Sequence, residues 1–477
     1  MTTRAAGPVG SGSVTLSAAS QLGAKVVHLL LNAVSTLAVL RYLAPDAYGT
    51  YVLVLTITTL VGVVADFGLP KLAVREMLRP GQVEDDVVGT VIVVRLGLAA
   101  VGVVGVQAAL ALFHQSPQAH LAGLISSLSI VVEAVLGIVV TVFHTRFVQQ
   151  YEAGIRVVAE AIETALVLVL IARGATLPML FVPPLVGLVV GTVLAVGLAT
   201  HRFGLKPRFH APLVRGLVRE ALPLGPALMI GVLYLKLDSF VIAALRPSSD
   251  LGLYAAAYQP IEYVFLGSAV FINVLYPLAT SAWATPGRVR FLEIYRRGTE
   301  LLVVLMLVVP VVVLVVADDL VHLAFGPAYA ASALPLQVLG LAVVLMTVNA
   351  WQSLVLLAGG HQRVTLRYNL AALGLSLVLC LVLVHAVGLV GAAMAALATG
   401  LFVLWASTRA VRRHMGATLD VSVLGRVVAL AAAATAALWT LDRVGVPWPL
   451  ATLAGLAAYG IGLSRLGVLR SLKEALT

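Results

Sequence analysis

Charged residues are scarce in this chain of 477 residues. Asp, Glu, Lys and Arg make up 11% of it, whereas they form about a quarter of a typical soluble globular protein. Hydrophobic residues make up 61%. In water such a chain would expose too much apolar surface, so its composition excludes a soluble globular protein.

Cysteine and clustered metal ligands are also lacking. Cys380 is the single cysteine, so the chain cannot form an intrachain disulfide. The ten histidines show no paired ligand spacing. We therefore expect no metal site, no cofactor and no catalytic residue.

Long polar connections are absent as well. The longest segment between apolar stretches, at about 200–221, is basic and too short for a soluble domain. A membrane polymerase or glycosyltransferase would need a sizeable catalytic loop on one face. The most acidic of the other loops, near Asp318 and Asp319, has only His322 beside it. This enzyme class is therefore the least favoured function.

The chain does have apolar stretches of about 20 residues, the length at which a helix crosses about 30 Å of hydrocarbon. Their number predicts an all-α polytopic membrane protein with about 14 transmembrane helices. The stretches cover residues 17–40, 51–69, 88–113, 121–143, 155–173, 177–199, 222–245, 253–283, 299–317, 333–358, 368–385, 388–408, 425–440 and 449–467.

Basic residues fall mainly into every second connection between these stretches. This alternation is typical of cytoplasmic loops, and it predicts that both termini lie in the cytoplasm of a cell membrane. Contact of these loops with anionic lipid headgroups accounts for the net charge of +10, so no nucleic acid partner is expected. The small residues Ala18, Ala19 and Ser20 stand at the start of the first stretch, which does not fit a cleavable signal peptide.

A weak internal repeat occurs at an offset of about 204 residues. An even number of spans separates the two copies, so they would share one orientation, as in transporters whose substrate path lies between two lobes. The matching residues are Arg41, Asp46, Gly49 and Tyr51 after the first stretch, and Arg246, Asp250, Gly252 and Tyr254 after the seventh.

Several short motifs follow one another in a consistent order between residues 17 and 408. They are 48–51 (YGTY), 65–69 (ADFGL), 73–76 (AVRE), 325–329 (FGPAY), 359–363 (GGHQR), Asn369 and 388–393 (GLVGAA). The ordered set resembles the polysaccharide-export flippases, the Wzx-type O-antigen and exopolysaccharide translocases. These belong to the MOP superfamily, which also contains the MATE exporters and the lipid II flippases.

The resemblance implies two pseudo-symmetric six-helix lobes followed by two further helices. It also implies that a polyprenyl-pyrophosphate-linked oligosaccharide is moved from the cytoplasmic to the outer leaflet by alternating access, with a polysaccharide polymerase as a partner protein. The expected divisions are a flexible cytoplasmic tail (1–16), the N-terminal lobe (17–199), a cytoplasmic linker (200–221), the C-terminal lobe (222–408), two helices (425–467) and a cytoplasmic tail (468–477).

Polar and charged side chains within the spans are the candidate site residues. An ionisable group at the bilayer centre costs roughly 2.5 to 3.5 kcal/mol, so it needs a partner, a wet cavity or a function. We expect a hydrated substrate passage, in which a cation could bind pyrophosphate. Internal pairing, for example of Arg95 with Glu133 or Glu160, is the alternative. The candidates for substrate binding are Lys25, His28, Asn32, Arg95, Lys236, Tyr258, Asn349 and Gln352.

Carboxylates within the spans are candidates for proton or sodium coupling, because they could change protonation during transport. They are Glu133, Glu160, Glu163, Asp238 and Glu262. Asp66 and Gly68 form a predicted helix end, with a hinge or gate as the functional interpretation. Gly187 and Gly191 form a small-residue helix-packing motif.

Two related functions remain as alternatives. A lipid II flippase would share the pyrophosphate site. A MATE-type cation or drug antiporter would need an acidic, aromatic cavity with few buried cations, and Lys25 and Arg95 weigh against it.

Overall fold

The computed structural model describes residues 11–146 and 148–465. These residues form α-helices and two short 3-10 helices, and no strand occurs among them. Most of the predicted N-terminal tail, residues 1–10, and the predicted C-terminal tail, 468–477, lie outside the described residues. Helix α1 begins at Ser11, so the last part of the predicted N-terminal tail is already helical.

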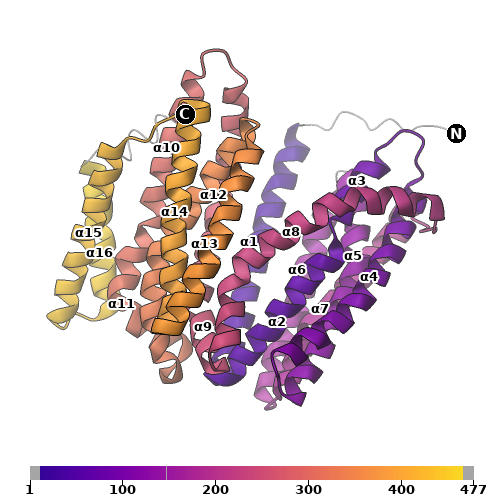
Figure 1. Cartoon of the computed structure of the whole chain (residues 1–477), viewed down its shortest axis with the longest axis horizontal. Helices are drawn as coiled ribbons and strands as arrows, with labels where there is room; N and C mark the ends of the chain where they lie inside the picture. The colour runs from indigo at the N-terminus through magenta and orange to yellow at the C-terminus, as the bar shows by residue number, and fades with distance from the viewer. Residues whose placement is uncertain (1–10, 147, 466–477) are drawn as a thin grey trace. The chain divides into compact units, whose positions relative to one another are not determined.

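The chain divides into two compact units, residues 1–236 (unit 1) and 237–477 (unit 2). The division falls inside helix α8 (Ala211–Leu245). The other elements of unit 1 are α1 (Ser11–Tyr42), α2 (Pro45–Asp66), α3 (Leu69–Met77), α4 (Glu84–Leu112), α5 (Pro117–Thr145), α6 (Gln150–Ala172), η1 (Leu177–Phe181) and α7 (Val182–Phe203) (Figure 1).

Unit 2 holds the remaining helices. They are α9 (Ser248–Trp283), α10 (Val289–Met306), α11 (Val308–Phe325), η2 (Pro327–Ser332), α12 (Ala333–Ala358), α13 (Gln362–Val387), α14 (Leu389–Met415), α15 (Val421–Arg443) and α16 (Trp448–Arg465).

Every predicted span falls on a helix, and the predicted all-α polytopic membrane fold is confirmed. Among the described residues, 12 helical segments are long and apolar enough to cross a membrane. Helices α6 and α16 are not among them. Four charged side chains lower the hydropathy of α6, and α16 is short and rich in glycine and other weakly apolar residues.

The predicted span 299–317 is divided between α10 and α11, which meet at Leu307. Pro310 lies in the first turn of α11. A proline there has no N–H to donate to the preceding turn, which accounts for a helix boundary at this point. The two helices together form one candidate membrane segment, Val289–Phe325.

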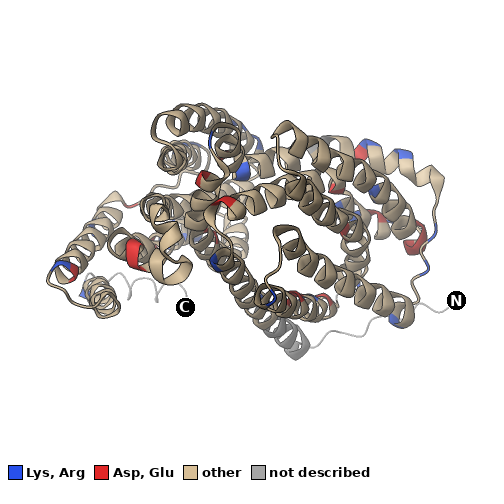
Figure 2. Ribbon diagram, turned by 90° about the horizontal axis from the view of Figure 1, so that it is seen from below, with Lys and Arg blue, Asp and Glu red and all other residues tan. Residues whose placement is uncertain are grey.

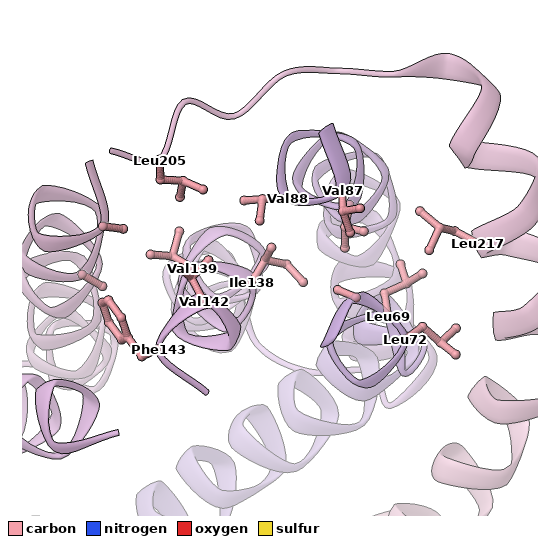
Figure 3. Packing of buried hydrophobic residues seen from close by; sticks show 14 of the residues in the cluster. Leu69, Leu72, Val87, Val88, Ile138, Val139, Val142, Phe143, Leu205 and Leu217 are labelled. Atoms are coloured by element: carbon pink, nitrogen blue, oxygen red, sulfur yellow. The ribbon is translucent and has the colours of Figure 1, made fainter. Parts of the chain in front are cut away.

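The core of unit 1 near the ends of α4, α5 and α7 holds the segment that follows α7 in place (Figure 3). Leu205 and Leu217 are buried in this core. The backbone N–H of Arg208 donates to the Asp85 carbonyl at 2.9 Å, and a Cβ on Gly89 would lie 2.4 Å from the Arg208 backbone. The predicted linker 200–221 is therefore packed against α4 and continues directly into α8.

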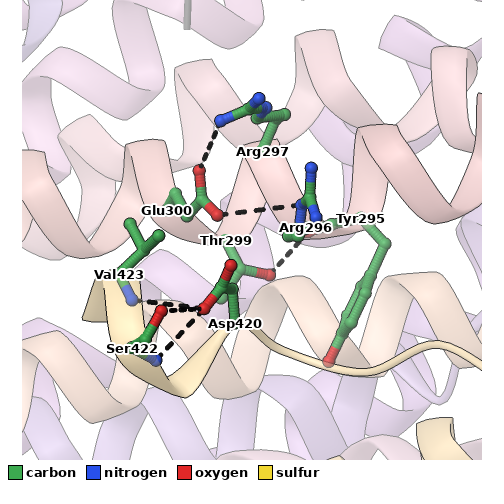
Figure 4. A network of polar contacts seen from close by, with 8 residues as sticks. All are labelled: Tyr295, Arg296, Arg297, Thr299, Glu300, Asp420, Ser422 and Val423. Atoms are coloured by element: carbon green, nitrogen blue, oxygen red, sulfur yellow. Dashed lines mark hydrogen bonds and ion pairs between the residues drawn. The ribbon is translucent and has the colours of Figure 1, made fainter. Parts of the chain in front are cut away.

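Helices α15 and α16 pack against α10 and α11 in the core of unit 2. The Tyr459 hydroxyl donates to the Val304 carbonyl at 3.1 Å. At one end of this core Glu300, which is 2% exposed, pairs with Arg297 at 3.2 Å, and Asp420 caps the N-terminus of α15 (Figure 4). The last two helices are thus an integral part of unit 2.

Candidate functional site

Unit 1 contains a cavity of about 700 Å³ whose walls come from α1 to α7. Charged residues are few along the helices (Figure 2), yet several line this one space. They are Asp66, Glu133, Glu152, Glu160, Glu163, Arg95 and Arg156, with His28 beside them. The structure thus brings together most of the site residues predicted in this half of the chain.

Arg95 is the most deeply buried charge of the cavity, with 3% of its surface exposed. Its Nη2 lies 2.5 Å from Oδ1 of Asp66, and its Nη1 donates to the carbonyls of Glu133 and Ala134 at 3.1 Å each. The guanidinium therefore ties α4 to α2 and α5. The structure pairs Arg95 with Asp66 and not with the carboxylate of Glu133 or Glu160, and because Arg95 also lines the cavity its contact with substrate stays a prediction.

Gly137 makes room for this guanidinium. A Cβ at position 137 would lie 2.7 Å from Nη1 of Arg95, too close for any real side chain. The sequence alone did not reveal this role, because the glycine and the arginine lie on different helices.

His28 and Glu160 meet across the contact between α1 and α6. Nδ1 of His28 lies 3.1 Å from Oε2 of Glu160, which is an ion pair when the histidine is protonated, and both Nδ1 of His28 and Oε1 of Glu160 are buried without a hydrogen-bond partner. An unpartnered carboxylate oxygen is costly in a low-dielectric interior unless a proton or a cation binds to it. Glu160 therefore has one buried carboxylate oxygen without a hydrogen-bond partner at the wall of the cavity.

Charged residues recur along one face of α6, at spacings of four, four and three: Glu152, Arg156, Glu160 and Glu163. Such spacing places them on one side of a helix. Glu152 lies 2.6 Å from His144 Nε2 and 3.3 Å from Arg156. Glu152 was not among the predicted site residues, although it shares this helix face with Glu160.

A smaller cavity of about 240 Å³ adjoins the first between α2, α5 and α7. Glu133, Thr59 and Ser129 border both spaces. The hydroxyl groups of Ser126 and Thr58 are joined by a 3.0 Å hydrogen bond in the wall of the smaller cavity. Unit 1 thus contains two adjoining spaces lined by carboxylate and hydroxyl groups.

The corner after α2 places Asp66 at the cavity. Phe67 and Gly68 both have positive φ angles, 49° and 73°, which end α2 and start α3. The Phe67 ring packs against Gly225 of α8, where a Cβ would lie 2.4 Å from the ring. The helix end predicted at Asp66 and Gly68 is present, and a gating role for it stays a prediction.

Gln21, Lys25, His28, Asn32 and Ser35 form a polar stripe along α1, with spacings of four, three, four and three residues, and part of it faces α6. Ser35 donates to Thr164 at 3.0 Å in a buried contact. Lys25 is exposed and Asn32 is half-buried, and neither lines the larger cavity. The side chain of Gln21, the first member of the stripe, lies outside the described residues.

Four of the predicted site residues lie on α8 and α9. Lys236, Asp238, Tyr258 and Glu262 are all half-buried. The Asp238 carboxylate accepts a short hydrogen bond from the hydroxyl of Tyr254, whose ring stacks on that of Tyr258 with centroids 6.1 Å apart. Asp238, Tyr258 and Glu262 belong to unit 2.

Asn349 and Gln352 lie in contacts between helices of unit 2. Gln352 is fully buried, and its amide group bonds Ser407, Thr408 and Tyr295. Asn349 donates to the Gly400 carbonyl at 3.2 Å, and its Oδ1 is buried without a partner. These bonds join α12 to α14 and α10.

Within the part of the chain that the structure describes, no group of three or more His, Cys, Asp or Glu side chains could hold a metal ion. The larger cavity nevertheless carries five carboxylates against two arginines. Its electrostatic character suits exchange of a proton or a monovalent cation, together with hydrogen bonding to polar groups.

Comparisons with known proteins agree on the fold. Residues 38–334 match a family described as polysaccharide biosynthesis protein. The structure of the lipid II flippase MurJ in an inward closed conformation is similar at a TM-score of 0.74 and 12% identity, and the match covers 95% of this chain and 99% of that one.

Two transporter structures are also similar. An inward-facing multidrug resistance MATE family transporter gives a TM-score of 0.64 at 13% identity, covering 80% of this chain and 94% of that one. A MOP superfamily transporter from Pyrococcus furiosus gives a TM-score of 0.54 at 14% identity, and the match covers 84% of this chain and 95% of that one. No curated protein matches the sequence. The predicted MOP-type fold and family resemblance are confirmed.

Proposed function

Because the chain belongs to the polysaccharide biosynthesis protein family, we propose that it moves a polyprenyl-pyrophosphate-linked oligosaccharide from the cytoplasmic to the outer leaflet of a membrane. It would act by alternating access and would catalyse no chemical reaction. The likeness to a lipid II flippase over nearly the whole chain supports this proposal.

The observation that carries the proposal is the charged cavity inside a bundle of membrane helices. Apolar helices that only anchor a protein have no need for a space of about 700 Å³ lined by seven charged side chains. Buried charge in a membrane is costly and is associated with ion or substrate movement. The cavity therefore supports transport over a structural or an enzymatic role.

We assign the coupling step to the carboxylates of this cavity. Glu160, paired with His28 through one oxygen and unpartnered at the other, would bind a proton or a sodium ion, with Glu133 and Glu163 beside it. Asp238 and Glu262 on the other unit remain candidates for the same role. Lys25, Lys236, Tyr258, Asn349 and Gln352 remain candidates for substrate contact.

We place the protein in the cytoplasmic membrane with both termini inside, next to a polysaccharide polymerase. The alternation of basic connections supports this orientation.

Reconstitution of the protein into proteoliposomes tests the proposal. A fluorescent polyprenyl-pyrophosphate oligosaccharide should become accessible to a membrane-impermeant quencher faster in these vesicles than in protein-free vesicles. Lipid II serves as the competing substrate. Movement of lipid II alone would favour the related flippase function, and movement of neither lipid would contradict the proposal.

A cation antiporter is the second candidate, and one observation favours it. Carboxylates outnumber arginines five to two in the cavity of unit 1, which suits a cationic substrate. Proton-driven efflux of a cationic dye from the same proteoliposomes, without movement of either lipid, would support this function.

A further inference from the structure

Three segments at one end of unit 2 form a strongly basic surface. They are the α9–α10 connection with the start of α10 (284–297), the α12–α13 connection with the start of α13 (359–367), and the end of α14 (409–416) (Figure 1). Together they contain nine arginines and one glutamate, and two of these arginines, Arg296 and Arg297, pair with the buried Glu300. The alternation of charge predicts that this end faces the cytoplasm, and a cytoplasmic position accounts for the large number of arginines. It does not account for the arrangement of Arg288, His361 and His414.

Two histidines from different segments are in contact there. The ring centroids of His361 and His414 are 4.8 Å apart. The Met415 side chain also lies close to the start of α13, since a Cβ on Gly359 would lie 2.7 Å from Cε of Met415. The start of α13 and the end of α14 are therefore fixed against each other, with two imidazoles side by side.

Arg288, the residue before α10, has an unusual backbone conformation. Its φ angle is 54°, in the left-handed region that glycine favours, and it follows Gly287, which has a φ of 83°. Its guanidinium lies 3.7 Å from the ring centroid of Trp283, which in turn packs edge-on against the buried Phe291. A non-glycine residue in this region stores strain, which persists where the surroundings fix it and often marks a functional position.

These three groups act on one another. Partial burial, then the charges of His414 and Arg288, lower the pKa of His361. Exposed arginines lie on the same segments at positions 290, 363, 412 and 413. Like charges gathered in this way repel one another, and an anion bound between them would relieve that repulsion.

The geometry also supplies backbone donors. Arg288 and His361 are the N-caps of α10 and α13, helices of 18 and 26 residues. The first N–H groups of a helix have no partner within it and favour phosphate groups. A metal ion is a poor fit, because two imidazoles are too few ligands and the arginine would repel a cation.

We propose that Arg288, His361 and His414 form a binding site for the diphosphate headgroup of the lipid-linked substrate. The identity of the ligand rests on the proposed function, whereas the phosphate chemistry rests on these side chains. The site lies on unit 2, separate from the carboxylate cavity of unit 1, so the anion and the coupling ion would be bound by different units.

Binding of inorganic pyrophosphate to the purified full-length protein in detergent tests the site. It should be followed by ³¹P NMR at about 0.15 M salt, where surface charges are screened beyond about 8 Å. The key variant is Arg288→Gly, because glycine accepts the left-handed backbone without strain and should fold at least as well as the wild type. We expect it to weaken pyrophosphate binding about tenfold, as for the loss of one charge-assisted hydrogen bond.

The matched control is Arg426→Gln at the start of α15, whose guanidinium bonds its own helix at the Ser422 carbonyl. This variant should bind pyrophosphate like the wild type, and the double variant His361→Gln/His414→Gln should bind it more weakly. Equal loss of binding in the control, or unchanged binding in Arg288→Gly, would overturn the site. Full displacement of pyrophosphate by phosphatidylglycerol added to the detergent micelles would overturn its assignment to the diphosphate substrate.

The proposal and the proposed function can fail separately. If pyrophosphate binding depends on Arg288 but the protein moves no lipid, the binding site is supported and the flippase function is contradicted. If Arg288→Gly moves lipid at the wild-type rate in proteoliposomes, the flippase function is supported and Arg288 takes no part in substrate binding.

Discussion

Arg95 and Asp66 form an ion pair with 2.5 Å between nitrogen and oxygen, and it joins α4 to the end of α2. The arginine side chain is 4% exposed and the aspartate side chain 33%, so the pair sits at the boundary between the cavity and the packed interior. Arg95 also donates to two backbone carbonyls of α5, so its side chain connects three helices.

Asp66→Asn should destabilise unit 1 by leaving the Arg95 charge without a counter-ion. We expect a loss of about 2–3 kcal/mol in the free energy of unfolding, less than for a fully buried pair because Asp66 is partly exposed. The double variant Asp66→Asn/Arg95→Met should lose less than the sum of the two single changes. Chemical unfolding in detergent measures each value. Lys25→Ala is the control, since Lys25 is exposed, and a comparable loss in this control would contradict the assignment.

Glu160→Gln should remove the dependence of transport on an ion gradient. The amide keeps the size of the side chain but cannot exchange a proton or neutralise a cation. Lipid movement in proteoliposomes, measured with and without an imposed proton or sodium gradient, should become equal in the two conditions. Glu293→Gln on the exposed start of α10 is the control and should respond to the gradient like the wild type. A preserved response in Glu160→Gln would exclude Glu160 as the coupling group.

Gly187→Ala should separate α6 from α7. A Cβ at position 187 would lie 2.8 Å from the Ala159 carbonyl oxygen, which is backbone and cannot rotate away. Overpacking of this kind costs about 1–3 kcal/mol. Gly197→Ala on the same helix has open space around it and should be neutral or slightly stabilising. Unfolding temperatures in detergent compare the two variants, and equal values would argue against close packing at Gly187.

Asp420→Asn should make the start of α15 less stable at neutral pH and leave it unchanged at low pH. Hydrogen bonds from Ser422 and from the Val423 N–H lower the pKa of Asp420 in the folded protein. A lowered folded-state pKa gives a contribution to stability that is present above the unfolded pKa of about 3.9 and is lost as the pH falls through the folded value. Hydrogen exchange in α15 should therefore differ between wild type and variant at pH 7 and converge in acid. A difference that grew in acid would contradict this role.

The sequence predicted the membrane helices well because hydropathy over about 20 residues reports directly on burial in lipid. It did not predict the helical extension of α8 back to Ala211. Residues 211–221 carry Arg215, Arg219 and Glu220, so they are too polar for a span although they form a helix against the core of unit 1. Hydropathy finds helices that are apolar enough to cross a membrane and misses more polar helical segments.

The candidate site was predictable only in part. The charges of α6 share one face, and their spacing is visible in the sequence. The pairing of Arg95 with Asp66 is not, because it joins two helices and depends on Gly137 of a third for space. The contacts of Gln352 were not predictable for the same reason, since its hydrogen-bond partners Ser407 and Tyr295 lie more than 50 positions away in the sequence.

Glu133 borders both cavities of unit 1, and more than a third of its surface is exposed. A rotation about its side-chain bonds takes picoseconds to nanoseconds, whereas collective movements of helices take microseconds to milliseconds. If Glu133 carries the coupling ion, transfer between the two cavities is therefore fast compared with any rearrangement of the backbone. The turnover rate of coupled transport would then be insensitive to this step and would report only on the slower movement of the helices.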